Sequence, residues 1–188
     1  MDDAIEGLTF SLLKATGEEE KMTVSRDLSK ARNNIKGFIN AFNEMNKTIR
    51  DRTFIDSEND RRGALQDMRS IRNLTLNLRQ TGLLAMEGAA EGELSRLTEI
   101  GISFEKDGTM VIEDQELLDQ MLQDNPGQVE KLFIDENSVL SIMKTKTESY
   151  TKSGTGIIAT LESGLDQKIE RLDNRIESQD KYLARYEE

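Results

Sequence analysis

Apolar residues between positions 28 and 49 recur every three or four residues, which is the spacing that puts side chains on one face of an α-helix. The members of this core stripe are Leu28, Ile35, Phe38, Phe42, Met45 and Ile49, with Ala31 between the first two. The stripe predicts a helix from Ser25 to about Arg50, capped by Ser25 or Asp27. Because the repeat is so regular, we expect this helix to pack lengthwise on a helix from the carboxy-terminal half of the chain.

The segment from Ile102 to Ile112 predicts a β-hairpin, and two loops are compatible with its sequence. A two-residue Asp-Gly loop would pair Phe104 with Val111 and divide the apolar residues between two faces. The three-residue loop Lys106-Asp107-Gly108 instead pairs Phe104 with Met110 and Ile102 with Ile112 on one face. It requires Gly108 at positive φ, as in a G1 bulge. Since the buried face decides strand register, we predict the three-residue loop.

Shorter helices are predicted on both sides of the hairpin. After it, Asp114 can cap a helix with four apolar residues, and Asn125-Pro126 can begin another. Before it, a helix is predicted from about Leu65 to Arg79, with one side formed by Leu65, Met68, Ile71, Leu74 and Leu78. The remaining segments are predicted as a polar loop at 51–63, a flexible connection around Gly82, Gly88 and Gly92, and strands at 8–13 and 22–25.

The last third of the chain predicts two helices separated by Ser153-Gly154-Thr155-Gly156. The second helix carries an apolar stripe, called here the arm stripe, made of Leu165, Ile169, Leu172, Ile176 and Leu183. Within this arm, few charges have a partner three or four residues away; Glu177 with Lys181 is one exception and Arg185 with Glu188 another. An apolar stripe of about four heptads is marginal as an isolated helix, so the arm needs a partner helix. Gln179 interrupts the stripe and either sets its register or belongs to a frayed end.

These elements predict an α+β protein that is mostly helical, a helical bundle with small β-hairpins and a long carboxy-terminal coiled-coil helix. Residues 1–156 form the mixed core and residues 157–188 the arm. The chain has 188 residues, of which 36% are apolar and 32% charged, and this balance fits a modest core with long solvated helices. There is no apolar run near the roughly 20 residues that a membrane helix needs, and Met1 begins no secretory signal pattern.

The net charge of −11 comes from one block. Between Glu87 and Glu136 there are fourteen acidic and three basic residues, and the rest of the chain is neutral. This pattern argues against nucleic acid, which requires clustered lysine and arginine. The acidic block is either a solvated surface or a surface that meets basic groups across a subunit contact.

The residue inventory disfavours catalysis and metal binding. Without histidine or cysteine, the usual nucleophile pairs and common zinc sites cannot form. Asp56, Glu58 and Asp60 have the alternate spacing of a calcium loop, but Arg61 stands where that loop requires glycine and Asp67 where it requires glutamate. We therefore expect a solvated acidic turn there, and we expect no enzyme activity, cofactor or metal.

Several motifs together resemble one family. The ordered set is Ile100-Gly101-Ile102-x-Phe104-x-x-Asp107-Gly108-Thr109, the leucine-rich helix after it, Asn125-Pro126, and Leu132-Phe133. The aromatic–asparagine pair at Phe42-Asn43, the Gly63-x-Leu65-x-Asp67 stretch and the Ser153-Gly154 break add to it. This set is similar to the carboxy-terminal part of the bacterial flagellar filament cap family, hook-associated protein 2.

The resemblance implies a structural cap and assembly chaperone at the flagellum tip, which retains exported flagellin and guides its polymerisation. It implies a ring of about five copies, with flagellin, hook–filament junction proteins and a flagellar export chaperone as further partners. It also implies an extracellular location reached through the flagellar secretion apparatus without a cleaved signal, and a role in motility and cell adhesion. Residues 1–156 would then correspond to the family's leg domain, and the chain to a fragment that lacks the head and terminal helices.

Two other interpretations remain open at this point. The first is a cytoplasmic coiled-coil adaptor that binds partner helices through residues 157–188. The second is a minor enzyme or calcium-binding module. No nucleic acid and no membrane is expected as a partner under any of these interpretations.

Overall fold

The computed structural model describes residues 27–84, 86, 88–90 and 92–186 and has the predicted α+β, mostly helical fold. The strands predicted at 8–13 and 22–25 lie outside the described residues. The elements are α1 Ser29–Thr53, β1 Ile55–Asp56, β2 Arg61–Arg62, α2 Arg69–Leu83, a 3-10 turn η1 Leu97–Ile100, β3 Ile102–Phe104, β4 Met110–Ile112, α3 Gln115–Asp124, α4 Pro126–Ile134, α5 Val139–Thr151 and α6 Ile157–Ala184.

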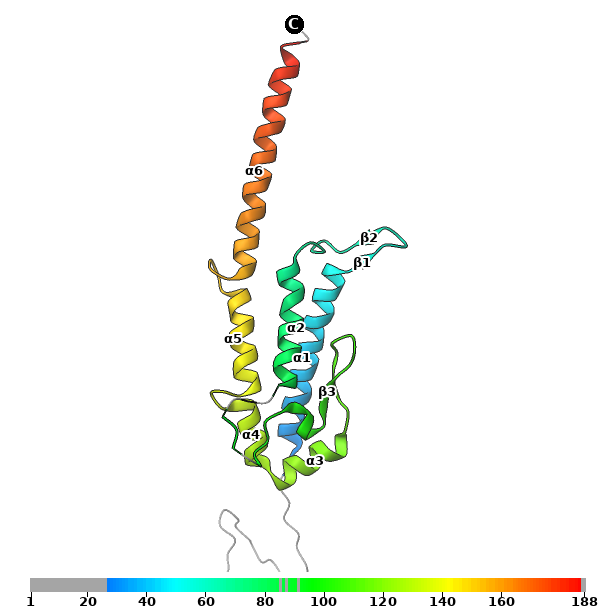
Figure 1. The fold of residues 1–188 in the computed structure, drawn as a ribbon, viewed down its shortest axis with the longest axis vertical. Coiled ribbons are helices and arrows are strands. Elements are labelled where there is room, and N and C mark those ends of the chain that lie inside the picture. The colour runs from blue at the N-terminus through cyan, green and yellow to red at the C-terminus, as the bar shows by residue number, and fades with distance from the viewer. Residues whose placement is uncertain (1–26, 85, 87, 91, 187–188) are drawn as a thin grey trace, which may run out of the picture.

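Three helices lie side by side in the body of the molecule (Figure 1). The chain runs along α1, returns along α2 and rises again through α5, so that α2 lies between α1 and α5. The β3–β4 hairpin packs against α1, and α3 and α4 close the lower end. Beyond α5, helix α6 extends away from this body. The arrangement thus separates a packed core from a long projecting helix.

The main partner of α1 differs from the prediction. Helix α1 packs on α2 and on β4. It meets helices of the carboxy-terminal half through an edge contact between Phe38 and Phe133 of α4, with ring centroids 6.3 Å apart, and through the Arg32–Asp119 ion pair to α3. The lengthwise partner predicted from the carboxy-terminal half is therefore wrong. The helix itself begins at Ser29 and ends at Thr53. The carboxylate of Asp27 accepts a hydrogen bond from the Ser29 N–H, 2.9 Å away, whereas Ser25 lies outside the described residues.

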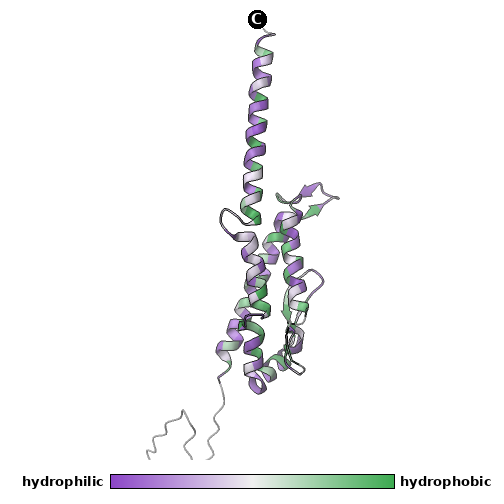
Figure 2. Ribbon diagram, turned by 60° about the vertical axis from the view of Figure 1, so that its left-hand side comes forward, coloured by the Kyte–Doolittle hydropathy of each residue, from purple (hydrophilic) through white to green (hydrophobic). Residues whose placement is uncertain are grey.

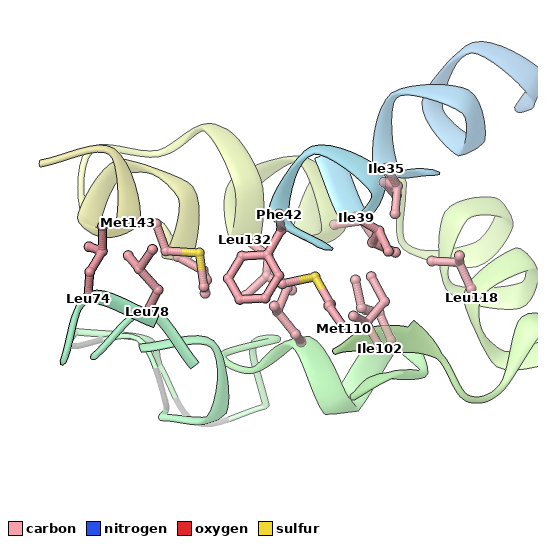
Figure 3. Close-up of a cluster of buried hydrophobic side chains, with 14 of the residues drawn as sticks. Ile35, Ile39, Phe42, Leu74, Leu78, Ile102, Met110, Leu118, Leu132 and Met143 are labelled. Carbon is pink, nitrogen blue, oxygen red and sulfur yellow. The ribbon is translucent and has the colours of Figure 1, made fainter. Parts of the chain in front are cut away.

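The core stripe of α1 is only partly buried. Ile35 and Phe42 are buried, whereas Leu28, Phe38, Met45 and Ile49 are half-buried. The most deeply buried apolar side chains come instead from η1, the hairpin, α3 and α4, where Leu97, Ile100, Ile102, Met110, Leu118 and Leu132 are fully buried. Figure 3 shows how these side chains meet those of α1, α2 and α5 in one continuous core.

The hairpin has the predicted register. Ile102 pairs with Ile112 and Phe104 with Met110, and Gly108 has a φ of 86°. The Glu105 N–H donates to the Thr109 carbonyl at 2.8 Å, which leaves Lys106, Asp107 and Gly108 as the loop. The pairing of apolar residues on one face therefore determines the length of the loop, as the sequence pattern indicated.

Two polar side chains of α1, Asn43 and Arg50, hold this hairpin in place. The Asn43 side-chain amide donates to the Met110 carbonyl and accepts from the Met110 N–H, both at 2.8 Å. Arg50, two turns further along α1, donates to the Asp107 carboxylate in the loop. Asn43 thus replaces a neighbouring strand at the edge of β4, which keeps a buried backbone pair satisfied. The sequence pattern did not assign this role to Asn43.

Replacing Gly108 by valine should lower the free energy of unfolding by roughly 1–3 kcal/mol, because a β-branched residue is strained at positive φ. Chemical denaturation of both proteins measures this difference. Full tolerance of valine would contradict the described loop.

The stability of the hairpin should depend on pH through Asp107. Hydrogen bonds from the N–H and side chain of Thr109, followed by the Arg50 guanidinium, lower the pKa of Asp107 from 3.8 to about 2. A carboxyl whose pKa is lower in the folded state stabilises the protein above its unfolded pKa, and this contribution disappears as the pH falls through the folded pKa. The stability difference between the wild type and Asp107→Asn should therefore be constant above pH 3.8 and vanish towards pH 2.

Denaturation curves collected between pH 2 and pH 6 measure this dependence. Arg50→Met should retain part of it, because Thr109 still donates to Asp107. A stability difference between the wild type and Asp107→Asn that does not change with pH would contradict the assignment.

The segment predicted as a polar loop contains a second, smaller hairpin. Ile55 pairs with Arg62 and Asp56 with Arg61. Backbone carbonyl atoms of α1 come so close to Gly63 that a Cβ there would lie 2.3 Å from the Arg52 oxygen, which ties the base of this β1–β2 finger to the end of α1. The prediction missed it because two residues per strand carry too little alternation to be recognised.

Helix α2 also differs from its predicted bounds. It begins at Arg69, after turns at 64–67, and it continues to Leu83. Ile71, Leu74 and Leu78 are buried as the pattern indicated, but Leu65 and Met68 precede the helix and are half-buried. Gly82 lies inside α2 and not in a flexible connection. It is buried, and a Cβ there would meet the Phe104 ring at 2.6 Å, so this glycine allows close contact between α2 and the hairpin.

Candidate functional site

The candidate site is the exposed apolar face of α6. The preceding break fixes where this helix starts, since a Cβ on Gly156 would lie 2.6 Å from the carbonyl oxygens of both Tyr150 and Lys152. The Gly156 N–H donates to the Lys152 carbonyl at 2.7 Å, and Gly154 has a φ of 75°. The two helices predicted on either side of Ser153–Gly156 are present as α5 and α6. The glycines thus form a defined corner from which α6 projects.

Only the first turns of α6 touch the core. Ile157 and Leu161 are packed against it, and every described residue from Glu162 to Tyr186 is exposed. Figure 2 shows hydrophobic positions recurring among hydrophilic ones along the whole projecting helix. The arm stripe therefore receives no cover from the described part of this chain.

The exposure of the arm stripe is large for apolar side chains. Leu165 is 42% exposed, Ile169 57%, Leu172 49%, Ile176 56% and Leu183 58%. Single exposed apolar residues are ordinary, but a continuous stripe with helical spacing is typical of a surface that binds another helix. Lys181 bonds Glu177 across one turn at 2.6 Å, as predicted, whereas Glu188, the predicted partner of Arg185, lies outside the described residues.

A second apolar surface lies between α1 and the α4–α5 unit. It consists of two adjoining grooves of about 640 and 460 Å³ that share Phe38, Phe133, Ile134 and Leu140. Three of the half-buried members of the core stripe, Leu28, Phe38 and Met45, line these grooves. The core stripe thus divides its residues between the interior and this open face.

Part of the acidic block forms ion pairs within the chain. Asp119 accepts from Arg32 at 2.8 Å, Lys131 lies 3.2 Å from Glu93, and Asp107 pairs with Arg50. These contacts hold α3, the hairpin loop and the segment before η1 against α1 and α4. For these three carboxylates the basic partner belongs to the same chain and not to another subunit.

The residues with calcium-like spacing form the tip of the β1–β2 finger. Asp56 accepts a hydrogen bond from the Asn59 side chain at 2.8 Å and from the backbone N–H groups of Asn59 and Glu58 at 3.2 Å. These bonds, with that of the Asn59 side chain the largest, lower the pKa of Asp56. The Asp56 carboxylate is thus occupied in closing a turn. Among the described residues, no group of three or more possible ligands is placed to hold a metal ion.

The fold and the site define the chain as a mostly helical α+β domain whose projecting helix carries an apolar stripe with heptad spacing. Comparison with known families identifies it further, because the family described as flagellar hook-associated protein 2 C-terminus matches residues 1–188. The chain belongs to this family.

The chain is also similar to curated relatives. It is 29% identical over 184 residues to the A-type flagellar hook-associated protein 2 of Pseudomonas aeruginosa, covering 95% of this chain and 37% of the relative. It is 26% identical over 190 residues to flagellar hook-associated protein 2 of Vibrio cholerae, covering 100% of this chain and 28% of the relative. It is 26% identical over 202 residues to flagellar hook-associated protein 2 of Salmonella typhimurium, covering 98% of this chain and 41% of the relative.

The chain thus spans at most about two fifths of the length of these relatives. No solved structure matches the chain. Within the described residues, no helix is both long and apolar enough to span a membrane.

Proposed function

We propose that this chain is part of the structural cap at the tip of the bacterial flagellar filament, where it acts as an assembly chaperone that retains exported flagellin and guides its polymerisation. The cap is a ring-shaped homo-oligomer of about five copies. Its other partners are flagellin, hook–filament junction proteins and, before export, a flagellar export chaperone. It works outside the cell and reaches the tip through the flagellar secretion apparatus without a cleaved signal peptide. It has no enzymatic role.

The observation that carries this proposal is the combination of family membership over residues 1–188 with the open stripe on α6. A cap must contact its own copies and the filament through surfaces that the folded monomer leaves uncovered. The arm stripe is such a surface, and the core of residues 27–156 supports it as a compact base. Residues 1–156 then correspond to the leg domain of the cap family and residues 157–188 to the arm towards the terminal part of the cap.

The alternative is a cytoplasmic adaptor that binds partner helices through the same arm. Both functions require the arm stripe, but only the cap requires it outside the cell for filament growth. The two are therefore distinguished by where flagellin accumulates when the stripe is disrupted.

Changing Leu172 and Ile176 together to glutamate in the full-length protein should abolish filament growth. Two charges in the middle of the stripe would be desolvated by any helix that packs there. The measurement is the distribution of flagellin between attached filaments and the medium in cells whose only copy of the gene carries the double change. We expect flagellin to be exported and lost to the medium as unassembled protein.

A matched control adds the same charge on the opposite side of α6. Gln167→Glu with Asn174→Glu should leave filament growth unchanged, because both positions face away from the stripe. Normal filaments with Leu172→Glu and Ile176→Glu would refute the proposal. Flagellin retained inside the cell would favour the adaptor.

A further inference from the structure

The tip of the β3–β4 hairpin contains a chemically reactive pair of residues. Asp107-Gly108 is the one Asp-Gly pair in the sequence, and no Asn-Gly pair occurs in it. In an Asp-Gly pair the backbone nitrogen of the glycine can attack the aspartate side chain, because no Cβ hinders the approach and the glycine backbone is unusually free to turn. The hairpin loop therefore contains a position that is intrinsically open to rearrangement of the backbone.

This rearrangement would take place in two steps. The Gly108 nitrogen forms a bond to Cγ of Asp107 and gives up its proton while the carboxyl group loses a hydroxyl, so that one water leaves and a five-membered succinimide ring remains. Water then opens the ring. When water adds to the main-chain carbonyl of Asp107, the chain continues through Cγ and the former main-chain carbonyl becomes a free carboxylate. The product is isoaspartate, which adds one carbon atom to the backbone of the loop.

The folded hairpin holds each reacting group in another contact. The Gly108 N–H donates to the Glu105 carbonyl at 3.0 Å, which directs the attacking nitrogen towards Glu105. One carboxylate oxygen of Asp107 accepts from the Thr109 N–H at 2.9 Å, and the other pairs with the Arg50 guanidinium. With both oxygens held, the carboxylate cannot turn towards the Gly108 nitrogen without breaking charge-assisted hydrogen bonds.

The same contacts keep Asp107 in its less reactive form. Hydrogen bonds from Thr109, followed by the Arg50 guanidinium, lower the pKa of Asp107 to about 2 because they stabilise the ionised carboxylate. A neutral carboxyl group can lose water when it is attacked, whereas a carboxylate has no good leaving group. At neutral pH the folded loop therefore holds almost none of the form that closes the ring.

One side of α1 carries the groups that hold the loop. Asn43, Asn46 and Arg50 follow one another at spacings of three and four residues, which places them on the same side of the helix. Asn43 bonds both backbone groups of Met110 at 2.8 Å, and Asn46 is buried beside the loop. Arg50 pairs with Asp107, which is 57 residues away in the chain. The restraint on the reactive pair thus depends on the packing of the hairpin against α1.

From this arrangement we propose that Asp107 is a latent site of isoaspartate formation, which α1 keeps closed as long as the hairpin lies against it. The site opens when the hairpin leaves α1, because the carboxylate then loses Arg50 and the loop is free to turn. Such local openings require only part of the free energy of unfolding. This chemistry is independent of the proposed cap function, and it uses only contacts among the described residues.

The modified loop would no longer fit the hairpin. The three-residue loop depends on Gly108 at a φ of 86° and on the bond from the Glu105 N–H to the Thr109 carbonyl. An extra backbone carbon at residue 107 lengthens the loop between these points, and the new carboxylate lies on the main chain and not where Arg50 binds it. Isoaspartate at this position should therefore weaken the packing of the hairpin against α1, so that one opening favours the next.

Incubation of the 188-residue chain in neutral buffer for several weeks tests this proposal. Isoaspartate is labelled with an isoaspartyl methyltransferase and located by mass spectrometry of proteolytic peptides. A synthetic peptide of residues 103–111 gives the rate of the same sequence without the fold. The folded chain should form isoaspartate at residue 107 at least about 100-fold more slowly than the peptide, because only the open state reacts. Rates within about threefold of each other would overturn the proposal.

The variant Arg50→Met removes the contact between α1 and the reactive carboxylate. It should accelerate isoaspartate formation at residue 107 by about threefold to tenfold, because a partly exposed charge-assisted bond is lost. The matched control is Arg52→Met, which removes the same charge from an exposed position two residues further along α1. Equal rates in the two variants would contradict the assigned role of Arg50.

The variant Asn43→Ala loosens the hairpin without changing the reactive pair or Arg50. It removes both bonds to Met110 and should raise the rate at residue 107 by about tenfold or more. Asp56-Ser57 in the β1–β2 finger is the internal reference, so the measured quantity is the ratio of isoaspartate at residue 107 to that at residue 56. If this ratio rises in Arg50→Met but not in Asn43→Ala, detachment of the hairpin does not open the site and the proposal is wrong.

Discussion

Replacing Phe42 by alanine should lower the free energy of unfolding by about 3–5 kcal/mol. The Phe42 side chain is 5% exposed and lies in the core beside Met110 (Figure 3). Its ring also meets that of Phe104 edge-on, with centroids 5.6 Å apart and planes at 73°, a contact that stabilises beyond the buried area alone. Alanine would leave a cavity where α1, the hairpin and α4 meet.

Equilibrium denaturation in urea measures this loss. Phe54→Ala is the matched control, because Phe54 is 38% exposed and lies 6.0 Å from the Arg61 guanidinium at the base of the finger. The control should cost less than about 1 kcal/mol. Equal effects of the two substitutions would contradict the placement of Phe42 in the core.

Replacing Gly101 by alanine should cost at least about 3 kcal/mol, from two separate causes. Gly101 has a φ of 77°, which strains any residue with a Cβ. A Cβ at this position would also lie 2.3 Å from the Asp114 carbonyl oxygen, where the chain leaves the hairpin for α3. The Gly101 carbonyl accepts hydrogen bonds from the N–H groups of Glu113 and Asp114, so the clashing segment cannot move without losing them.

Gly108→Ala separates these two causes. Gly108 has a similar φ of 86°, but the nearest atom to its Cβ would be the Asn46 side-chain nitrogen at 3.4 Å. This control should cost only about 1–2 kcal/mol, the strain of positive φ alone. Denaturation of both variants under the same conditions gives the difference. A Gly101→Ala variant no less stable than Gly108→Ala would refute the close contact with Asp114.

Patterns with a strong period predicted their elements correctly from the sequence. The hairpin register followed from the need to place Ile102, Phe104, Met110 and Ile112 on one face, and the break before α6 followed from the Ser-Gly-Thr-Gly run. The Asp114 cap is also present, with its carboxylate accepting from the Leu117 N–H at 2.8 Å. In each case one local requirement excluded the alternatives.

Features that depend on distant contacts were not predictable in this way. No local feature of the sequence shows whether α1 packs on α2, α4 or α5, because each of these helices has an apolar face. The Asn43 amide can hold the hairpin only because the edge of β4 lies beside it, although Met110 is 67 residues away in the chain. The sequence pattern places Gly82 in a flexible connection, because a glycine that allows close helix packing looks the same in a sequence as one that marks flexibility.

The exposure of the arm stripe agrees with the sequence pattern, whereas its role as an interaction site stays a prediction. The spacing of the arm stripe already predicted an unpaired helical surface, and the structure places that surface in the open on α6. The stripe itself specifies only the charge pattern and the register that a partner helix must match. The cap function is therefore a proposal from this surface and from the family.

The measurement that tests the central claim most directly is the mass of the 188-residue chain in solution, by light scattering, before and after changing Leu172 and Ile176 to glutamate. If the arm stripe is an assembly surface, the unchanged chain has a mass above that of the monomer and the double variant that of the monomer. The urea unfolding transition of the core should remain the same, since every residue from Glu162 to Tyr186 is exposed. The same mass before and after the change would contradict the account.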